Sequence, residues 1–171
     1  MMEIRKGAKL VGYIVERLRE EYEDIQIGKT VVQKMVYLSG IDSEIDFDYS
    51  MYHYGPFSKR TAGALDLSKK YGYVSMEWDP EKGYFIEPTG EFSEEGLDTE
   101  IKKTVDEVVE KYGKYKAIEL SMIATGIYVK ENFDYGSEEE LVEAVSSIKS
   151  EHDKEWIKEL LLGEGIIGQG E

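Results

Sequence analysis

Apolar residues recur at helical spacing along the first forty residues of the chain. The pattern predicts a first helix over residues 4–22, with apolar positions at alternating intervals of four and three on one face. These positions are Ile4, Ala8, Val11, Val15, Leu18 and Tyr22. A second helix is predicted over residues 29–39, because Val32, Met35 and Val36 fall on one side and Gly40 can end it.

From Phe47 the apolar period changes to two, which is typical of a short strand running to Tyr54. The sequence Tyr54-Gly55-Pro56 then predicts a chain reversal, because glycine has free φ and proline fixes φ near the helical value. Pro56 should occupy the first turn of a third helix over residues 57–71. The inward positions of that helix are expected to be Phe57, Ala64, Leu65, Leu67 and Tyr71.

Aromatic and β-branched residues at 73–78 and 84–87 flank a loop of turn-forming residues, which predicts a β-hairpin. Residues 88–97 form a connector, and four further helices follow, one of them capped by Ser137 with Glu140 and the last ended by Gly163. The predicted fold class is α+β, mainly α. Residues 1–90 form a winged-helix-like module with a small β-hairpin, and residues 91–171 a helical extension packed on it.

The composition is that of a folded protein without membrane-spanning segments or disulfides. The 171 residues are 41% hydrophobic, enough for a folded core, and no apolar run approaches the roughly 20 residues that span a bilayer. We expect a cytoplasmic protein without membrane contact, and the absence of cysteine excludes disulfides and thiolate metal sites. Abundant Lys and Glu beside a single Asn is a thermophile-like bias.

The net charge of −15 disfavours nucleic acid as a partner, because non-specific affinity for phosphates comes from Lys and Arg. The charge is uneven: residues 1–90 carry about −3 and residues 91–171 about −12. The acidic excess therefore belongs mainly to the predicted helical extension.

Two glycine-containing segments resemble nucleotide-binding motifs but lack the required context. Gly28-Lys29-Thr30 matches the end of a P-loop, yet Glu23 stands where the motif needs glycine and a helix precedes it in place of a strand. The segment 163–168 has the spacing G-x-G-x-x-G, yet it follows a helix and no helix follows it. Neither segment predicts a cofactor.

No pattern predicts a metal site or a catalytic centre. His53 and His152 are the only imidazoles, and a metal site needs several converging ligands. Acidic residues alternate between 42 and 48, but the glycine and terminal glutamate of a calcium loop are out of place. We therefore expect a protein that is not an enzyme and uses no cofactor.

The densest cluster of aromatic and basic residues lies at 52–60 and supplies the candidate binding residues. Tyr52, Tyr54 and Phe57 are amphipathic anchors of the kind found in interface hot spots, and Lys59 and Arg60 follow them. The same rings would also serve to fill the corner between strand and helix. The leading hypothesis is a protein-interaction module that binds a partner here.

Lys59, Arg60, Lys69 and Lys70 make the third predicted helix basic, and in a winged helix this element would occupy the position of the recognition helix. The alternative hypothesis is therefore a winged-helix DNA-binding regulator. Against it, the hairpin loop offers only Lys82 beside Asp79 and Glu81. A solvated basic face accounts equally for the pattern.

Several short motifs, taken in order, resemble a known family. They are Val32-Gln33-Lys34-Met35-Val36-Tyr37-Leu38, Tyr54-Gly55-Pro56-Phe57-Ser58, residues 67–74, Pro88-Thr89-Gly90 and residues 118–125. Together they are similar to the YwgA-like proteins and, more distantly, to the Panacea domain of SocA-like antitoxins. The resemblance implies a winged-helix-like domain without known catalysis that acts through protein contacts, a toxin being one such partner.

A homodimer is an alternative to a different partner protein, because Trp78 or the apolar faces of the last helices could form its interface.

Overall fold

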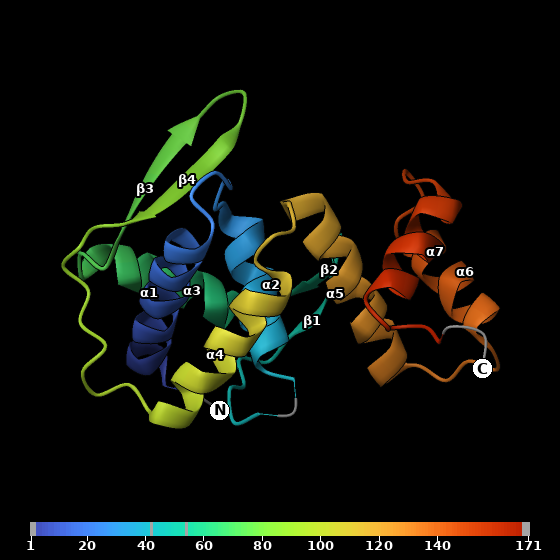
Figure 1. The fold of residues 1–171 in the computed structure, drawn as a ribbon, viewed down its shortest axis with the longest axis horizontal. Helices are drawn as coiled ribbons and strands as arrows, with labels where there is room; N and C mark the ends of the chain where they lie inside the picture. The colour runs from blue at the N-terminus through green and yellow to red at the C-terminus, as the bar shows by residue number, and fades with distance from the viewer. Residues whose placement is uncertain (1–2, 42, 54, 169–171) are drawn as a thin grey trace.

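The computed structural model describes residues 3–41, 43–53 and 55–168, and within these ranges seven helices and four short strands pack together (Figure 1). The helices are α1 (Ile4–Glu21), α2 (Lys29–Ser39), α3 (Lys59–Lys70), α4 (Thr99–Tyr112), α5 (Ala117–Asn132), α6 (Glu138–Ile148) and α7 (Lys154–Gly163). The strands are β1 (Ser50–Tyr52), β2 (Gly55–Phe57), β3 (Val74–Asp79) and β4 (Gly83–Pro88). The predicted α+β, mainly α class is confirmed.

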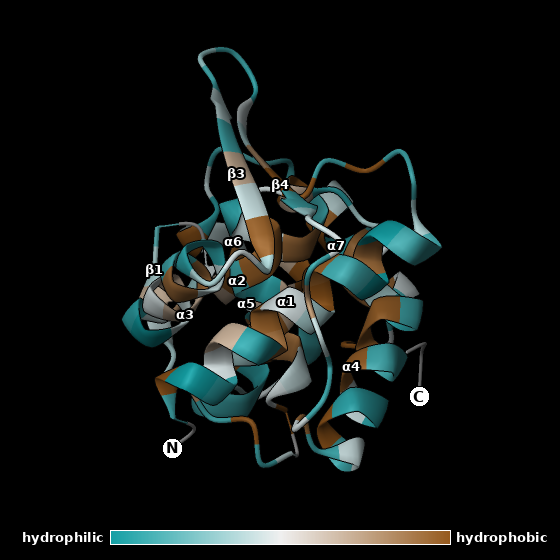
Figure 2. Cartoon of the chain, turned by 90° about the vertical axis from the view of Figure 1, so that its left-hand side faces the viewer, coloured by the Kyte–Doolittle hydropathy of each residue, from teal (hydrophilic) through white to brown (hydrophobic). Residues whose placement is uncertain are grey.

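Helix α1 lies at the centre of the N-terminal half, where it packs against α2, α3, α4 and β4 (Figures 1 and 2). Leu10 and Ile14 lie outside the predicted apolar stripe, yet both are 0% exposed. A Cβ at Gly12 would lie 2.8 Å from the ring of Phe92, so the connector crosses the helix at a glycine. Helix α1 is therefore buried on more sides than the single face that was predicted. Ile4, which was assigned to that face, is 42% exposed.

The segment between α2 and α3 contains a strand that the sequence did not predict. Strand β2 pairs antiparallel with β1, with Met51 opposite Pro56, so the expected chain reversal is a tight hairpin. Pro56 lies in this strand, and its predicted place in the first turn of a helix was wrong. Helix α3 begins only after Ser58, whose hydroxyl accepts a hydrogen bond from the Thr61 amide at 3.1 Å and caps the helix.

The inward face of α3 carries mostly small side chains, and α1 approaches it closely at Gly7, where an added Cβ would lie 3.1 Å from the Ala64 Cβ. The residues that it buries are Thr61, Ala64, Leu65 and Ser68, at spacings of three, four and seven from the first. Two residues predicted to face inward lie elsewhere: Leu67 is one position before Ser68, and Tyr71 follows Lys70, the last residue of the helix. Leu67 is half-buried and Tyr71 is 42% exposed, so their assignment to the core was wrong.

Strands β3 and β4 form the predicted hairpin, which projects from the body of the molecule (Figures 1 and 2). The Asp79 carboxylate shapes its turn by accepting hydrogen bonds from the amides of Glu81 and Lys82, at 2.8 and 2.9 Å. The Ile86 amide donates to the Ile27 carbonyl at 2.8 Å, which anchors β4 beside the start of α2. The two hairpins belong to separate sheets, β1–β2 and β3–β4.

The last four helices were predicted correctly. Helix α4 packs on α1 and α2, and α5 on α2 and β2, so both halves of the chain contribute to one hydrophobic core. Helices α6 and α7 pack on α5 and on each other, away from α1 (Figure 1). Ser137 caps α6 through the Glu140 amide, but the Glu140 carboxylate bonds to the Gly136 amide, one residue before the position that a capping box requires.

Across the described ranges, no helix is both long enough and apolar enough to cross a membrane.

Candidate interaction surface

The aromatic residues of the predicted binding cluster meet on the β1–β2 hairpin. The rings of Tyr52 and Phe57 stack with centroids 5.1 Å apart and planes 9° apart. Tyr52 is nevertheless 51% exposed, while Phe57 is half-buried beneath it. Tyr54, the third predicted anchor, lies outside the described residues. The stack thus supplies one supported ring, about half of which is accessible to a partner.

Basic residues flank this stack at the start of α3. Lys59 is exposed and Arg60 half-buried, and both line a shallow hollow of about 310 Å³ together with Tyr52 and Phe57. Asp48 and Ser50 also line this hollow. The structure therefore brings the described members of the predicted partner-binding set to one surface.

The residues of the predicted DNA-binding set are not gathered in this way. Lys69 and Lys70 are exposed at the other end of α3, so about 16 Å of helix separates Lys70 from Lys59. Asp66 is exposed on the same side between them. Helix α3 therefore offers two separate pairs of cations, interrupted by a carboxylate.

A buried polar network holds the corner in place, and sequence reasoning did not find it. Gln33 is 6% exposed, and its amide group makes two hydrogen bonds to the backbone of Ser58, donating to its carbonyl at 2.9 Å and accepting from its amide at 3.1 Å. The Ser58 hydroxyl in turn donates to the Phe47 carbonyl. Tyr49 completes the network, with its hydroxyl 2.8 Å from the Gln33 carbonyl and from the Thr61 hydroxyl. Fully paired buried groups of this kind fix a geometry.

Lys34 is the second unforeseen residue, since lysine is rarely buried. Its side chain is 2% exposed, and its ammonium donates to the Pro56 carbonyl at 3.0 Å. Burial, together with the charge of the nearby Lys149, lowers its pKa to about 8. In the sequence, Gln33 and Lys34 are two adjacent polar residues inside an otherwise apolar helix, and this pattern could have indicated their role. In the structure their hydrogen bonds hold α2 against the β1–β2 hairpin and the start of α3.

The close approach of β2 to α5 depends on a glycine. Gly55 has φ of +100°, which favours glycine, and a Cβ there would lie 2.6 Å from the Thr125 hydroxyl oxygen. Thr125 is fully buried, and its hydroxyl donates to the Ser121 carbonyl at 2.7 Å. The hairpin that carries Tyr52 is therefore seated on the body from two sides, by α2 and by α5.

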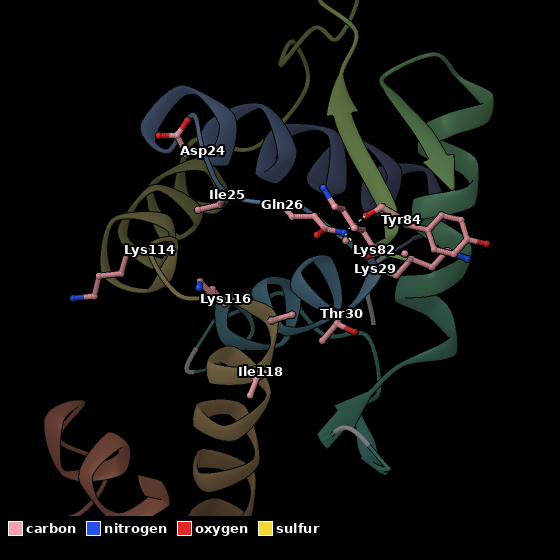
Figure 3. Close-up of a pocket in the computed structure, with 13 residues that line it drawn as sticks. Asp24, Ile25, Gln26, Lys29, Thr30, Lys82, Tyr84, Lys114, Lys116 and Ile118 are labelled. Atoms are coloured by element: carbon pink, nitrogen blue, oxygen red, sulfur yellow. Dashed lines mark hydrogen bonds between the residues drawn. The ribbon is translucent and has the colours of Figure 1, made fainter. Parts of the chain in front are cut away.

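A second hollow, of about 650 Å³, lies on another part of the surface (Figure 3). It contains Gly28-Lys29-Thr30, the segment that resembles the end of a P-loop. The structure agrees with the rejection of that motif, because helix α1 and a loop precede it.

Among the described residues, no group of three or more His, Asp or Glu side chains is arranged to hold a metal ion. The acidic segment before β1 has a local structural role, because the Asp46 carboxylate accepts a hydrogen bond from the Asp48 amide at 3.0 Å. Asp48 adopts φ of +59°, a conformation that aspartate tolerates better than most residues. Asp42 lies outside the described residues.

Comparison with models of known protein families, with curated proteins and with solved structures found no match to this chain.

Proposed function

We propose that this protein is a non-enzymatic interaction module, and that a partner protein binds the corner formed by β1, β2 and the start of α3. The observation that carries the proposal is the exposed Tyr52 ring, stacked on Phe57 beside Lys59 and Arg60. Aromatic residues and arginine dominate the binding energy of protein interfaces. The partner surface that fits is acidic, because two cations lie beside the ring and, among the described residues, Asp48 is the one carboxylate lining the hollow.

The arrangement beneath this surface supports a binding role. The network of Gln33, Ser58 and Tyr49 and the buried Lys34 keep the hairpin in one position, so little conformational entropy is lost when a partner docks. Because the aromatic ring is already held in place, the partner binds more tightly than it would bind the same ring on a mobile segment.

The proposal includes the winged-helix-like character of residues 1–90. The order α1, α2, β1–β2, α3 and the β3–β4 hairpin supports it, with α3 in the position of the recognition helix and the hairpin as the wing. The resemblance to YwgA-like proteins and to SocA-like antitoxins supports a toxin as the partner, and the composition of the chain supports a cytoplasmic location. DNA binding through Lys59, Arg60, Lys69 and Lys70 is the competing function.

The test begins with a photo-crosslinking amino acid placed at Tyr52, and in a matched variant at Tyr71, which is exposed to a similar extent near the far end of α3. A partner crosslinked from Tyr52 alone is then purified. Its dissociation constant is measured for Tyr52→Ala and Lys59→Glu, with Tyr71→Ala and Lys70→Glu as controls. The proposal expects a loss of roughly tenfold or more for the first pair and little change for the controls.

Circular dichroism of each variant verifies that it is folded. Equal losses for both pairs, or none for Tyr52→Ala, would show that the corner is not the binding surface. Duplex DNA binding that weakens steeply with salt, and is lost in Lys59→Glu and Lys70→Glu alike, would replace the proposal with the DNA-binding function.

A further inference from the structure

The second hollow, called the groove from here on, is built by three segments that lie far apart in the sequence (Figure 3). The loop from Asp24 to the first turn of α2 forms its floor, and the β3–β4 turn, residues 82–84, forms one wall. The junction between α4 and α5, residues 114–118, forms the other wall. The volume of about 650 Å³ is typical of a site for a small organic molecule.

Positive charge is concentrated in this groove, although the chain carries −15 overall. Of the described residues that line it, four are lysines, Lys29, Lys82, Lys114 and Lys116, and one, Asp24, is a carboxylate. In the described part of the chain, none of the four lysines forms an ion pair with a carboxylate. Like charges gathered without counterions repel one another, and a bound anion relieves that repulsion.

Contacts within the groove hold two of its segments in place. The Lys29 ammonium lies 4.1 Å from the centroid of the Tyr84 ring, which holds it at the wall of the groove. Gln26 donates to the carbonyls of Lys82 and Tyr84, at 2.7 and 2.9 Å, and so fixes the hairpin turn to the floor. Figure 3 places Lys116 across the groove from Lys82, with Lys114 at the far end.

The floor of the groove adds backbone donors to these cations. Gly28 is the residue before α2 and carries no capping side chain, so the first amides of α2 have no partner within the helix. The Thr30 side chain also lines the groove beside them. Neither φ nor packing demands glycine at position 28, because φ is −101° and an added Cβ would meet only the Tyr84 carbonyl, at 3.5 Å.

Apolar side chains complete the lining. Ile25, Ala117 and Ile118 border the groove, and Ile118 is 58% exposed, so its side chain is open to a ligand. An apolar strip beside cations suits a ligand that has both an organic body and a charged group.

We infer that this groove binds a phosphate-bearing small molecule, with the phosphate at the first turn of α2 beside Lys29 and Lys82 and the organic body toward Ile25 and Ile118. The site is distinct from a P-loop, because its cations come from three separate segments. It is also distinct from the proposed protein-binding corner, since no residue that the structure describes lines both hollows.

The test uses pyrophosphate and ADP as probes, added to the ¹⁵N-labelled protein in low salt and followed by NMR and calorimetry. The inference expects saturable binding, with the largest shifts at the amides of Lys29, Thr30 and Val31. ADP should bind more tightly than pyrophosphate, because only ADP reaches the apolar strip. Absence of saturable binding, equal affinity for the two probes, or shifts confined to other regions would overturn it.

Charge variants separate this site from a general electrostatic effect. Lys29→Gln with Lys82→Gln should weaken ADP binding roughly tenfold or more, because two contact charges are removed. Lys69→Gln with Lys70→Gln removes the same charge from α3 and should leave affinity nearly unchanged. Equal weakening in both double variants would refute the inference. A 20-nucleotide single strand that shifts the same amides and binds far more tightly than ADP would replace the small ligand with a nucleic acid.

Gly28→Asp provides a second test that does not depend on removing lysines. Aspartate is a preferred N-cap, so its carboxylate should accept from the free amides of α2 and leave stability equal or higher. The same carboxylate would occupy the donors and repel the phosphate. The inference therefore expects loss of ADP binding without loss of thermal stability, and retained affinity in this variant would contradict it.

Discussion

Substitution of Lys34 by methionine tests whether a buried ammonium holds the corner of the molecule. The pKa of Lys34 is lowered from 10.5 to about 8, chiefly by burial. Below pH 8 the ammonium is charged in both the folded and the unfolded chain, and its burial costs the folded state about 3 kcal/mol. Between pH 8 and 10.5 the folded state loses this proton first, so that cost disappears as the pH rises.

The free energy of unfolding of the natural protein should therefore rise relative to that of Lys34→Met as the pH increases. Linkage gives a relative gain of about 1.3 kcal/mol by pH 9 and about 2.5 kcal/mol by pH 10, measured from pH 7. The lost hydrogen bond to the Pro56 carbonyl adds an offset that does not change with pH. Burial raises the pKa of Tyr37 and of Tyr49, and because both proteins contain these residues, their titration cancels in the difference.

Urea unfolding of the two proteins at half-unit steps from pH 7.5 to 10 measures this difference. Lys103→Met, at an exposed position on α4, is the control and should give a flat difference over the same range. A flat or falling curve for Lys34→Met would refute the claim that Lys34 carries a buried charge at neutral pH. The corner would then rest on the other hydrogen bonds alone.

Two further substitutions address the same corner. Ser58→Ala should lower the free energy of unfolding by about 2 kcal/mol, because it removes the cap of α3 and leaves the buried Phe47 carbonyl without its donor, whereas Ser137→Ala at an exposed cap should cost about 1 kcal/mol or less. Gly55→Ala combines positive φ with a clash against Thr125 and should cost about 3 kcal/mol, while Gly90→Ala has positive φ but open space and should cost about 1 kcal/mol. Thermal or urea unfolding measures both pairs, and equal costs within either pair would contradict the packing described.

Local patterns in the sequence correctly predicted an element when its ends are set by residues next to it in the chain. Helix α2 begins at Lys29 and ends at Ser39 as expected, because Gly28 and Gly40 bound its apolar stripe. The predicted start of α3 was wrong because Pro56 and Ser58, two residues apart, are both residue types that favour the beginning of a helix. The hydrogen bonds from Gln33 and Lys34, more than twenty residues earlier, decide in favour of Ser58 by holding residues 55–57 as a strand.

The two candidate binding surfaces differ in how far sequence could reveal them. The corner is nearly contiguous in the chain, so Tyr52, Phe57, Lys59 and Arg60 form a cluster that the sequence alone displays. The groove joins residues near positions 28, 83 and 116, and each segment alone is an ordinary loop with one or two lysines. Only tertiary packing brings these lysines together, and no local periodicity encodes it.

The uneven charge of the chain also selects among anionic ligands by their size. Residues 91–171 hold about −12 of the total; α6 contains four glutamates and no Lys or Arg, and α4 contains one more acidic than basic residue. At physiological salt, charges more than about 8 Å apart are largely screened, so a short anion in the groove interacts mainly with the lysines it touches. A long polyanion would extend beyond the basic surfaces and meet acidic helices along its length. The same reasoning favours an acidic protein segment over duplex DNA at the corner, because Lys59 and Arg60 can neutralise only a few charges at a time.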